Sequence, residues 1–516
     1  MNIIKSKITI PIFLFLFSLI ILSYNLGGQG IMNDEWFHHG FTMTYFDLVS
    51  KGDFSNPCIT GIGECEMIMI ENCAEEIQWL ASGGMIKGII IGFGDYLFSE
   101  NERIYYTSIE PCRPITGKNF GIPGVNIPTT PELSAARTFV PVLASLTVVI
   151  CYSIGKIFFN RFTGITFAAL LLFHSLWMFH SRVIMSEVFH SIFSLLAILL
   201  LVYSLFGKEK IKIRYIIFSS ISFGLAVSTK ITILEVLPFI LILLAFGITR
   251  SKISVSDFRK IFSSKSFFAV FLFLIISGST LFITSPFYFP DPMNQVLVQI
   301  DAGKNYQAIN EPFSIQKNYG VQLMTPISVL IFPVYDVYYN LLQNDEIPHS
   351  MKYGHTFTSI PLSLFFVVGI FYLIKKIITK SLTVPEFLLI FWFVSIFFAL
   401  TITVDSYNKV HYFVPLIFPQ ILIAAYGFNT FVRNLKQKKI KIALFTISLI
   451  AHASTYLIFW ERIYFEPNRI WTLPIDINFR ESINDPIVQF TSVVFVVLFT
   501  SVCIIKRLNL FNSKIS

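Results

Sequence analysis

Long hydrophobic runs recur along this chain from one end to the other, and short polar segments separate them. Most runs approach the roughly 20 residues that an α-helix needs to cross the hydrocarbon core of a bilayer. The pattern therefore predicts an all-α polytopic membrane protein with about 12 transmembrane helices. The predicted spans cover residues 8–26, 135–157, 163–179, 187–206, 213–229, 231–249, 267–285, 357–375, 384–403, 411–431, 440–460 and 487–505.

Lysine and arginine residues lie mostly in the short segments between alternate spans. Cytoplasmic loops carry an excess of these residues, so this number of spans places both termini and every basic cluster in the cytoplasm. A missed or added span would place all later basic clusters on the non-cytoplasmic side. The clusters lie at Lys5–Lys7, Lys156–Arg161, Lys208–Arg214, Arg250–Lys265, Lys375–Lys380, Arg433–Lys441 and Lys506–Lys514.

Composition agrees with this interpretation. Of the 516 residues, 54% are hydrophobic and only 14% are charged, whereas about 25% of the residues of a soluble protein are charged. The net charge of +8 would suit a nucleic-acid partner, but the basic residues follow the topology instead. We therefore expect a multi-pass protein of the cell membrane.

Most residues outside the predicted spans fall on the non-cytoplasmic side, so we expect the protein to act there. The first run resembles a cleaved signal peptide in its charge, but its length and the lack of a small-x-small site favour a retained helix. The expected organisation is a first transmembrane helix at 1–26, an outer loop at 27–134, six spans at 135–285, a second outer loop at 286–356 and the last spans at 357–516.

The first outer loop has two further features. Four of the six cysteines lie in it, namely Cys58, Cys65, Cys73 and Cys112, which favours one or two disulfides in an oxidising compartment. A metal site is the alternative, although the chain has no CxxC pair, and the pairing of the cysteines is open. The segment Trp79–Phe98 is apolar but contains five glycines, and we interpret it as a helix lying at the outer membrane surface.

Polar residues gather at the predicted outer ends of the spans rather than at their centres. Charges inside a bilayer are costly and usually functional. Any one of these residues is explained as an interface anchor, but together they combine carboxylates, which accept protons or metals, with cations, which bind phosphate. They are Asp34, Glu35, His38, His39, Arg137, His180, Ser181, Arg182, Glu187, Lys230, Tyr288, Asp291, Asp405, Lys409, His411 and Tyr412.

These segments resemble those of the C-type membrane glycosyltransferases, in the branch of the protein O-mannosyltransferases and lipid A aminoarabinose transferases. Order, spacing and common outer placement carry the resemblance, which covers about 30–240 well and 355–430 loosely. The matching stretches are NDEW at Asn33, ARTFVPVLASLTVV at Ala136, HSRVIMSE at His180, GLAVSTK at Gly224 followed by Leu237-Pro238, and the looser HYFVPLIFP at His411.

The chain also departs from the family pattern. Glu187 stands where the family commonly has aspartate, and the family's His-Pro or Pro-Pro pair in the first loop is missing. The double-tryptophan motif of oligosaccharyltransferases is absent. Its absence counts against transfer of whole preassembled glycans to asparagine.

The resemblance implies a polyprenyl-phosphate–sugar donor and an acceptor hydroxyl on a protein, lipid or glycan, with the reaction on the outer face of the membrane. It implies Asp34 as the general base and Glu35 as its partner in contact with the acceptor or a metal ion. The expected ligands of the donor phosphate are Arg182, Lys230, His411 and Tyr412. A divalent metal ion is the one cofactor considered, held by Asp34 with Glu187 and His38.

The two adjacent histidines, His38 and His39, would point in different directions on a helix. On a helix, Asp34/His38 and Glu35/His39 are i,i+4 pairs, but adjacent residues point about 100° apart, so both rings cannot serve one ligand. His38 is the better candidate for a site role.

Two other classes of function remain as alternatives. A secondary transporter or flippase would show ionisable residues near the membrane midplane and an internal repeat, and neither is evident. A non-catalytic receptor or assembly subunit would leave the acids, Arg182 and Lys230 without a shared purpose.

Overall fold

The computed structural model describes residues 2–24, 26, 33–60, 85–99, 130–206, 213–249, 264–289, 291–297, 359–403, 410–433, 435 and 437–464. Within these ranges the regular structure consists of helices, without a β-strand. The predicted all-α class is therefore confirmed.

Eleven long helices make up the bundle in this described part of the chain. They are α1 (Asn2–Ser23), α7 (Phe139–Phe158), α8 (Arg161–Leu172), α10 (Ser186–Phe206), α11 (Ile213–Thr229), α12 (Leu237–Thr249), α13 (Ser264–Thr284), α17 (Ile360–Ile378), α18 (Val384–Thr403), α19 (Val414–Arg433) and α20 (Lys438–Tyr464).

Shorter helices connect them. They are α2 (Asn33–Ser50), α3 (Pro57–Thr60), α5 (Met85–Phe98), α6 (Thr130–Arg137), α9 (Ser175–His180) and the 3₁₀ helices η1 (Ile231–Val236), η3 (Pro286–Tyr288) and η6 (Val410–Phe413).

The helices follow the predicted spans closely. Each span predicted up to residue 460 overlaps a helix, whereas the last one, 487–505, lies outside the described residues. Six helices in the described part are long and apolar enough to cross a membrane by themselves. The multi-pass character is thus confirmed, and the exact number of spans stays a prediction.

Two predicted spans are interrupted near their expected outer ends. The third divides between α8 and α9 at Phe173 and His174, and the sixth begins with η1 before α12. Lys230 joins α11 to η1 in an extended conformation, with φ −164° and ψ 117°. Interruptions of this kind leave backbone groups at the helix ends without partners inside their own helix.

The helices differ in their position within the bundle. Helix α19 is buried along most of its length and packs against α17, α18 and α8. Helix α13 instead leaves large apolar side chains exposed, including Phe267, Phe268 and Phe271. A membrane protein covers such a surface with lipid, so α13 belongs to the periphery and α19 to the centre.

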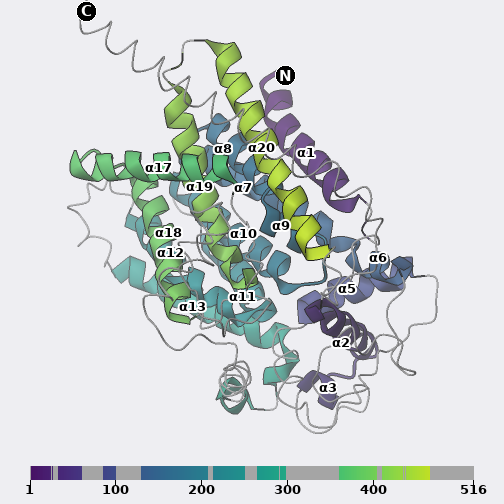
Figure 1. The fold of residues 1–516 in the computed structure, drawn as a ribbon. Helices are drawn as coiled ribbons and strands as arrows, with labels where there is room; N and C mark the ends of the chain where they lie inside the picture. Colours follow the sequence, from purple (N-terminus) through teal and green to yellow (C-terminus); the bar gives the residue numbers. More distant parts are fainter. Residues whose placement is uncertain are drawn as a thin grey trace, which may run out of the picture.

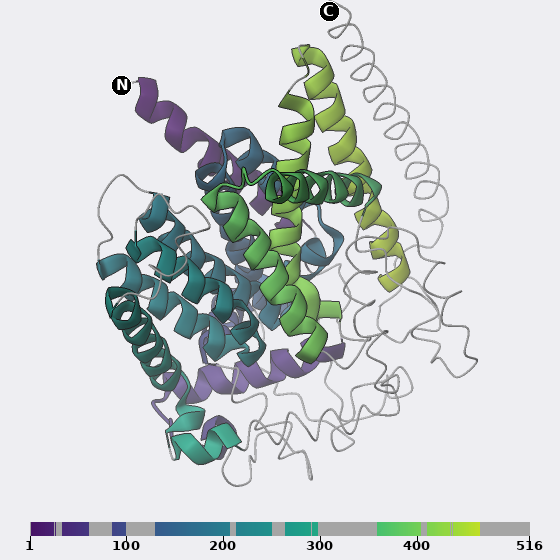
Figure 2. The ribbon, with the colours of Figure 1, turned by 90° about the vertical axis from the view of Figure 1, so that its left-hand side faces the viewer.

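Helices α2, α3, α5 and α6 gather at the end of the molecule opposite the start of α1 (Figure 1). In the second view the purple segments that follow α1 lie across that end of the bundle (Figure 2). Helix α5 packs on α2 and α6, and also on α7 and α11. The expected helix within Trp79–Phe98 is therefore present as α5.

Glycines allow several helices to approach each other closely. A Cβ on Gly427 of α19 would lie 2.6 Å from the backbone nitrogen of Gly369 in α17, and one on Gly155 of α7 would lie 3.0 Å from Cα of Gly164 in α8. Small residues at such crossings are the usual basis of helix association in membranes.

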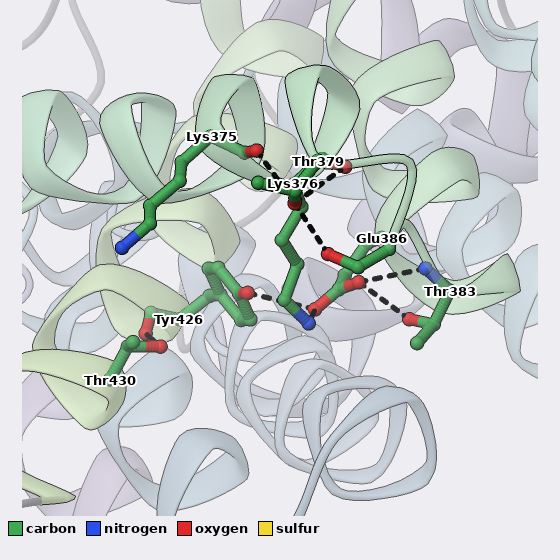
Figure 3. Close-up of polar contacts among 8 residues, drawn as sticks. Lys375, Lys376, Thr379, Thr383, Glu386, Tyr426 and Thr430 are labelled. Atoms are coloured by element: carbon green, nitrogen blue, oxygen red, sulfur yellow. Dashed lines mark hydrogen bonds and ion pairs between the residues drawn. The ribbon is translucent and has the colours of Figure 1, made fainter.

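The turn between α17 and α18 closes with a polar network (Figure 3). The Glu386 carboxylate accepts hydrogen bonds from the backbone N–H of Thr383 at 2.9 Å and from the Thr383 hydroxyl at 2.8 Å. It also pairs with Lys376 and accepts from the Tyr426 hydroxyl at 2.8 Å. A glutamate three residues after a threonine is typical of a capping box, so Glu386 caps the start of α18 and ties it to α17 and α19.

Candidate active site

A buried ion pair joins the start of α2 to the end of α6. Arg137 donates from Nε to Oε1 of Glu35 at 2.7 Å and from NH2 to Oε2 at 2.5 Å. Both side chains are fully buried. A bidentate ion pair of this kind fixes the relative orientation of the two side chains as well as their separation, because the planar guanidinium matches the carboxylate edge.

The same pair holds two further segments. Arg137 NH1 donates to the carbonyl of Leu26, just after α1, at 2.6 Å. The backbone N–H of Ile184, between α9 and α10, donates to Glu35 Oε1 at 2.7 Å. Glu35 and Arg137 therefore connect α1, α2, α6 and the α9–α10 connection at one point.

Arg182 lies in the same connection between α9 and α10. Its NH2 donates to the carbonyl of Tyr24, at the end of α1, at 2.6 Å. The side chain is mostly buried. It adds a second guanidinium to this end of the bundle.

A second ion pair lies in the first turn of α10. The Lys230 ammonium donates to Glu187 Oε1 at 2.7 Å, and His180 Nδ1 lies 3.8 Å from the other oxygen. The ammonium also lies 4.5 Å from the centre of the Tyr412 ring, a favourable cation–π arrangement. Residues of α9, α10, η6 and the α11–η1 junction thus meet here.

A third contact links the two ion pairs. Lys87 of α5 lies 2.8 Å from Nδ1 of His38 in α2 and donates to the Ser186 hydroxyl of α10 at 3.1 Å. Lys87 is almost completely buried. Since Ser186 precedes Glu187 and His38 follows Glu35 by one turn, the polar cluster is continuous.

Burial changes the protonation of the basic groups. It lowers the pKa of His39 to about 3, with a further contribution from Arg137. It lowers the pKa of His180 to about 4, and Glu187 opposes this shift while Lys230 adds to it. Burial likewise lowers the pKa of Lys87 to about 7. At neutral pH both imidazoles are therefore uncharged, and Lys87 is only partly protonated.

The structure brings together most of the residues singled out from the sequence. The cluster contains the predicted site residues Glu35, His38, Arg182, Glu187, Lys230 and Tyr412, together with His39, Arg137 and His180. Asp34 lies in the first turn of α2 and His411 in η6, but their side chains are outside what the structure describes. Their assigned roles stay predictions.

Other sequence predictions lie away from the cluster or outside the described residues. Asp291 is exposed and accepts a hydrogen bond from the backbone of Asn294 at 3.1 Å, so it caps a local turn. Asp405 and Lys409 are not among the described residues. The cysteines expected to form disulfides also fall outside: Cys65, Cys73 and Cys112 entirely, and Cys58 by its side chain.

Lys87 is a member of the cluster that sequence reasoning missed. The available signal was a lysine within an otherwise apolar surface helix, and this signal does not separate a residue at the interface from one turned inward. Because Lys87 is buried against His38 and Ser186, its side chain is turned inward.

The described side chains do not fit a divalent metal ion. No group of three or more His, Cys, Asp or Glu in this part of the chain is placed to hold one. Both oxygens of Glu35 already accept from Arg137, and Lys230 bonds to Glu187. The Nδ1 of His38 faces Lys87. The predicted set of Asp34, Glu187 and His38 is therefore not assembled by its described members.

Comparisons with known proteins agree with the resemblance seen in the sequence. Residues 121–288 match the family model of dolichyl-phosphate-mannose-protein mannosyltransferase. This range contains Arg137, Arg182, Glu187 and Lys230. No curated protein matches the sequence.

Of three similar solved structures, one matches with a TM-score above 0.5 and shows the shared fold. The structure of ArnT from Cupriavidus metallidurans bound to undecaprenyl phosphate matches with a TM-score of 0.51 at 11% identity, over 96% of this chain and 72% of that one. The apo form of that protein matches with a TM-score of 0.47 at 10% identity, over 96% and 76%. The archaeal oligosaccharyltransferase AglB from Archaeoglobus fulgidus matches with a TM-score of 0.47 at 12% identity, over 91% of this chain and 57% of that one. The family-model match confirms the resemblance to the mannosyltransferases, and the fold is similar to that of ArnT.

Proposed function

We propose that this chain is a membrane glycosyltransferase. It moves a sugar from a polyprenyl-phosphate-linked donor to an acceptor hydroxyl on the non-cytoplasmic face. One observation carries the proposal: a buried cluster at one end of the bundle in which three cations, Arg137, Arg182 and Lys230, and the partly charged Lys87 accompany two described carboxylates, Glu35 and Glu187. Such an excess of positive charge suits an anionic ligand.

The donor explains why the cluster lies where helices end. A polyprenyl phosphate keeps its lipid chain in the bilayer and its charged group at the interface. A site for it needs cations at the level of the headgroups, supplied by several helices at once. The ends of α1, α6 and α11 and the start of α10 provide this level.

The reaction needs a base and a stabilised leaving group. The acceptor oxygen attacks the anomeric carbon, and its proton passes to a carboxylate, for which Asp34 is the proposed base. The bond between that carbon and the phosphate oxygen breaks, and its electron pair leaves with the polyprenyl phosphate. A positioned base contributes roughly 10²–10⁴-fold to the rate.

Arg182 and Lys230 are the proposed partners of the leaving phosphate. Its charge grows as the bond breaks, so cations aimed at it stabilise the transition state more than the bound donor. Lys230 is held between Glu187 and the Tyr412 ring, which keeps its flexible side chain in one place before the donor binds. Tyr412 and His411 complete the proposed phosphate site.

Glu35 has a different proposed role from the one expected of an acceptor ligand. Both of its oxygens accept hydrogen bonds within the protein. We infer that it acts through position: by binding Arg137 and Ile184 it holds the first turn of α2, and therefore Asp34, against the start of α10.

The test is sugar release by the purified protein in lipid nanodiscs. The donors are short polyprenyl phosphates carrying mannose, glucose, N-acetylglucosamine or 4-amino-arabinose, each offered with a hydroxyl acceptor. The proposal expects one donor to yield free polyprenyl phosphate and glycosylated acceptor in equal amounts, and a parallel reaction with EDTA settles the metal requirement. Movement of a donor across the bilayer without cleavage would instead support the flippase alternative.

A further inference from the structure

Lys87 has an unusual environment for a lysine in an outer loop. It is 2% exposed, and its ammonium contacts His38 of α2 and the Ser186 hydroxyl of α10. A buried lysine is costly unless its hydrogen bonds are made. The chain therefore maintains this cation at the boundary between the surface helices and the bundle.

The helix that carries Lys87 is fitted closely to its neighbours. A Cβ on Gly88 of α5 would lie 3.2 Å from the Tyr45 ring, and one on Gly92 would overlap the Phe46 side chain and lie 3.1 Å from the Thr42 carbonyl. Gly88 and Gly92 are four residues apart and share one face of α5. Through this face α2 and α5 pack backbone to backbone, so a movement of one helix moves the other.

The direction of the hydrogen bonds follows from lysine chemistry. In its charged form the Lys87 ammonium has three donors and no acceptor, so His38 then accepts at Nδ1 and Ser186 accepts at its hydroxyl oxygen. The Lys87 nitrogen thus contacts both His38 on α2 and Ser186 on α10. Lys87 therefore acts beside the Glu35–Ile184 hydrogen bond in setting the distance between those two helix starts.

The two acceptors flank the residues of the proposed reaction. His38 lies four residues after Asp34, one turn along α2, and Ser186 is the neighbour of Glu187 and lies two residues after Ile184. We propose that Lys87 is a positioning residue for glycosyl transfer, which fixes the helix of the acid pair against the start of α10. The inference rests on the proposed function and adds a residue to that same site.

A positioning role predicts a particular kinetic effect. A shift of about 1 Å in a reacting group can lower a rate by about 10²-fold. Lys87→Met keeps the length of the side chain but removes the donors, so kcat should fall about 10- to 100-fold while the KM for the donor changes less than about threefold. Lys87→Arg restores two donors and should recover kcat at least about fivefold relative to Lys87→Met.

The matched control is Lys51→Met, which removes an exposed lysine just after α2. It should leave kcat and KM as in the unchanged protein. Ser186→Ala removes one of the two acceptors without touching the lysine and should lower kcat by a smaller factor. Elution as a single species in size exclusion, with a cooperative thermal transition, establishes that each variant is folded.

Two results would overturn the inference. One is a Lys87→Met variant with unchanged kcat, and the other is a rise in KM at constant kcat, which would make Lys87 a donor-binding group. If the unchanged protein transfers no sugar from any donor, the proposed function fails. The contact itself is then measured by a double-mutant cycle of Lys87→Met and His38→Asn in thermal unfolding, where additive effects would contradict it.

Discussion

Glu35 and Arg137 connect four segments of the described cluster. Their side chains are fully buried and bind Leu26 and Ile184 as well as each other. Removing one partner of a buried pair leaves the other charge without compensation, which typically costs about 3–5 kcal/mol.

This pair therefore gives a prediction for stability. Arg137→Met should lower the thermal unfolding temperature of the detergent-purified protein by several degrees, because Glu35 loses its guanidinium partner. The control is Arg161→Met, at the exposed start of α8, which should change the temperature little. Equal shifts in the two variants would show that the pair does not stabilise this end of the bundle.

Most members of this site could be predicted from the sequence, but which residues pair with each other could not. Charged residues at span ends identify Glu35, Arg137, Glu187 and Lys230 as a set. Arg137 lies 102 residues from Glu35, and Lys230 lies 43 from Glu187. Such pairs depend on how helices pack. Lys87 was missed for the same reason, since its partners come from α2 and α10.

At the scale of elements, the hydrophobic pattern predicts helix positions well and interruptions poorly. Span length follows from bilayer thickness, so the boundaries of α10, α11 and α18 agree with expectation. The division between α8 and α9 falls at Phe173 and His174. Neither residue is a proline or glycine, so no local signal marks it, and tertiary packing decides the break.

The glycines of α5 give the second prediction. Gly92→Ala places a methyl group against Phe46 and the Thr42 carbonyl, so α2 and α5 must separate. Both the unfolding temperature and the rate of sugar transfer should fall, the rate by about tenfold or more.

Gly278→Ala in α13 is the matched control for this substitution. Nothing lies within 4 Å of the Cβ that it adds, and alanine favours a helix over glycine by up to about 1 kcal/mol. This variant should be as stable as the unchanged protein or slightly more so. A Gly92→Ala variant that matches it in stability and rate would show that α2 and α5 do not need close contact.

At the scale of the whole molecule, the charge distribution predicts the orientation in the membrane. With Lys375 and Lys376 in the last turn of α17, the α17–α18 turn is predicted to lie in the cytoplasm, and α2 and α3 are predicted to lie on the outer face. Both termini would then lie inside. The proposed site would lie outside, at the end of the bundle that α2, α5 and α6 cover (Figures 1 and 2).

Cysteine labelling tests this orientation. In a background with the native cysteines replaced by serine, Ser55→Cys after α2 should react with a membrane-impermeant maleimide on intact cells. Ser381→Cys in the α17–α18 turn should react only after the membrane is opened, because both positions are exposed but lie on opposite sides. The reverse pattern would place the cluster in the cytoplasm and contradict the proposed topology.

The most direct test of glycosyl transfer is the activity of Asp34→Asn beside Asp47→Asn. Both substitutions replace a carboxylate of α2 with an amide of the same shape, but Asp47 lies thirteen residues further along the helix, roughly 20 Å away at 1.5 Å per residue. Sugar transfer is measured with the donor that the unchanged protein cleaves. Asp34→Asn should lose at least about 10²-fold in kcat while Asp47→Asn retains activity. Full activity in Asp34→Asn would contradict the account.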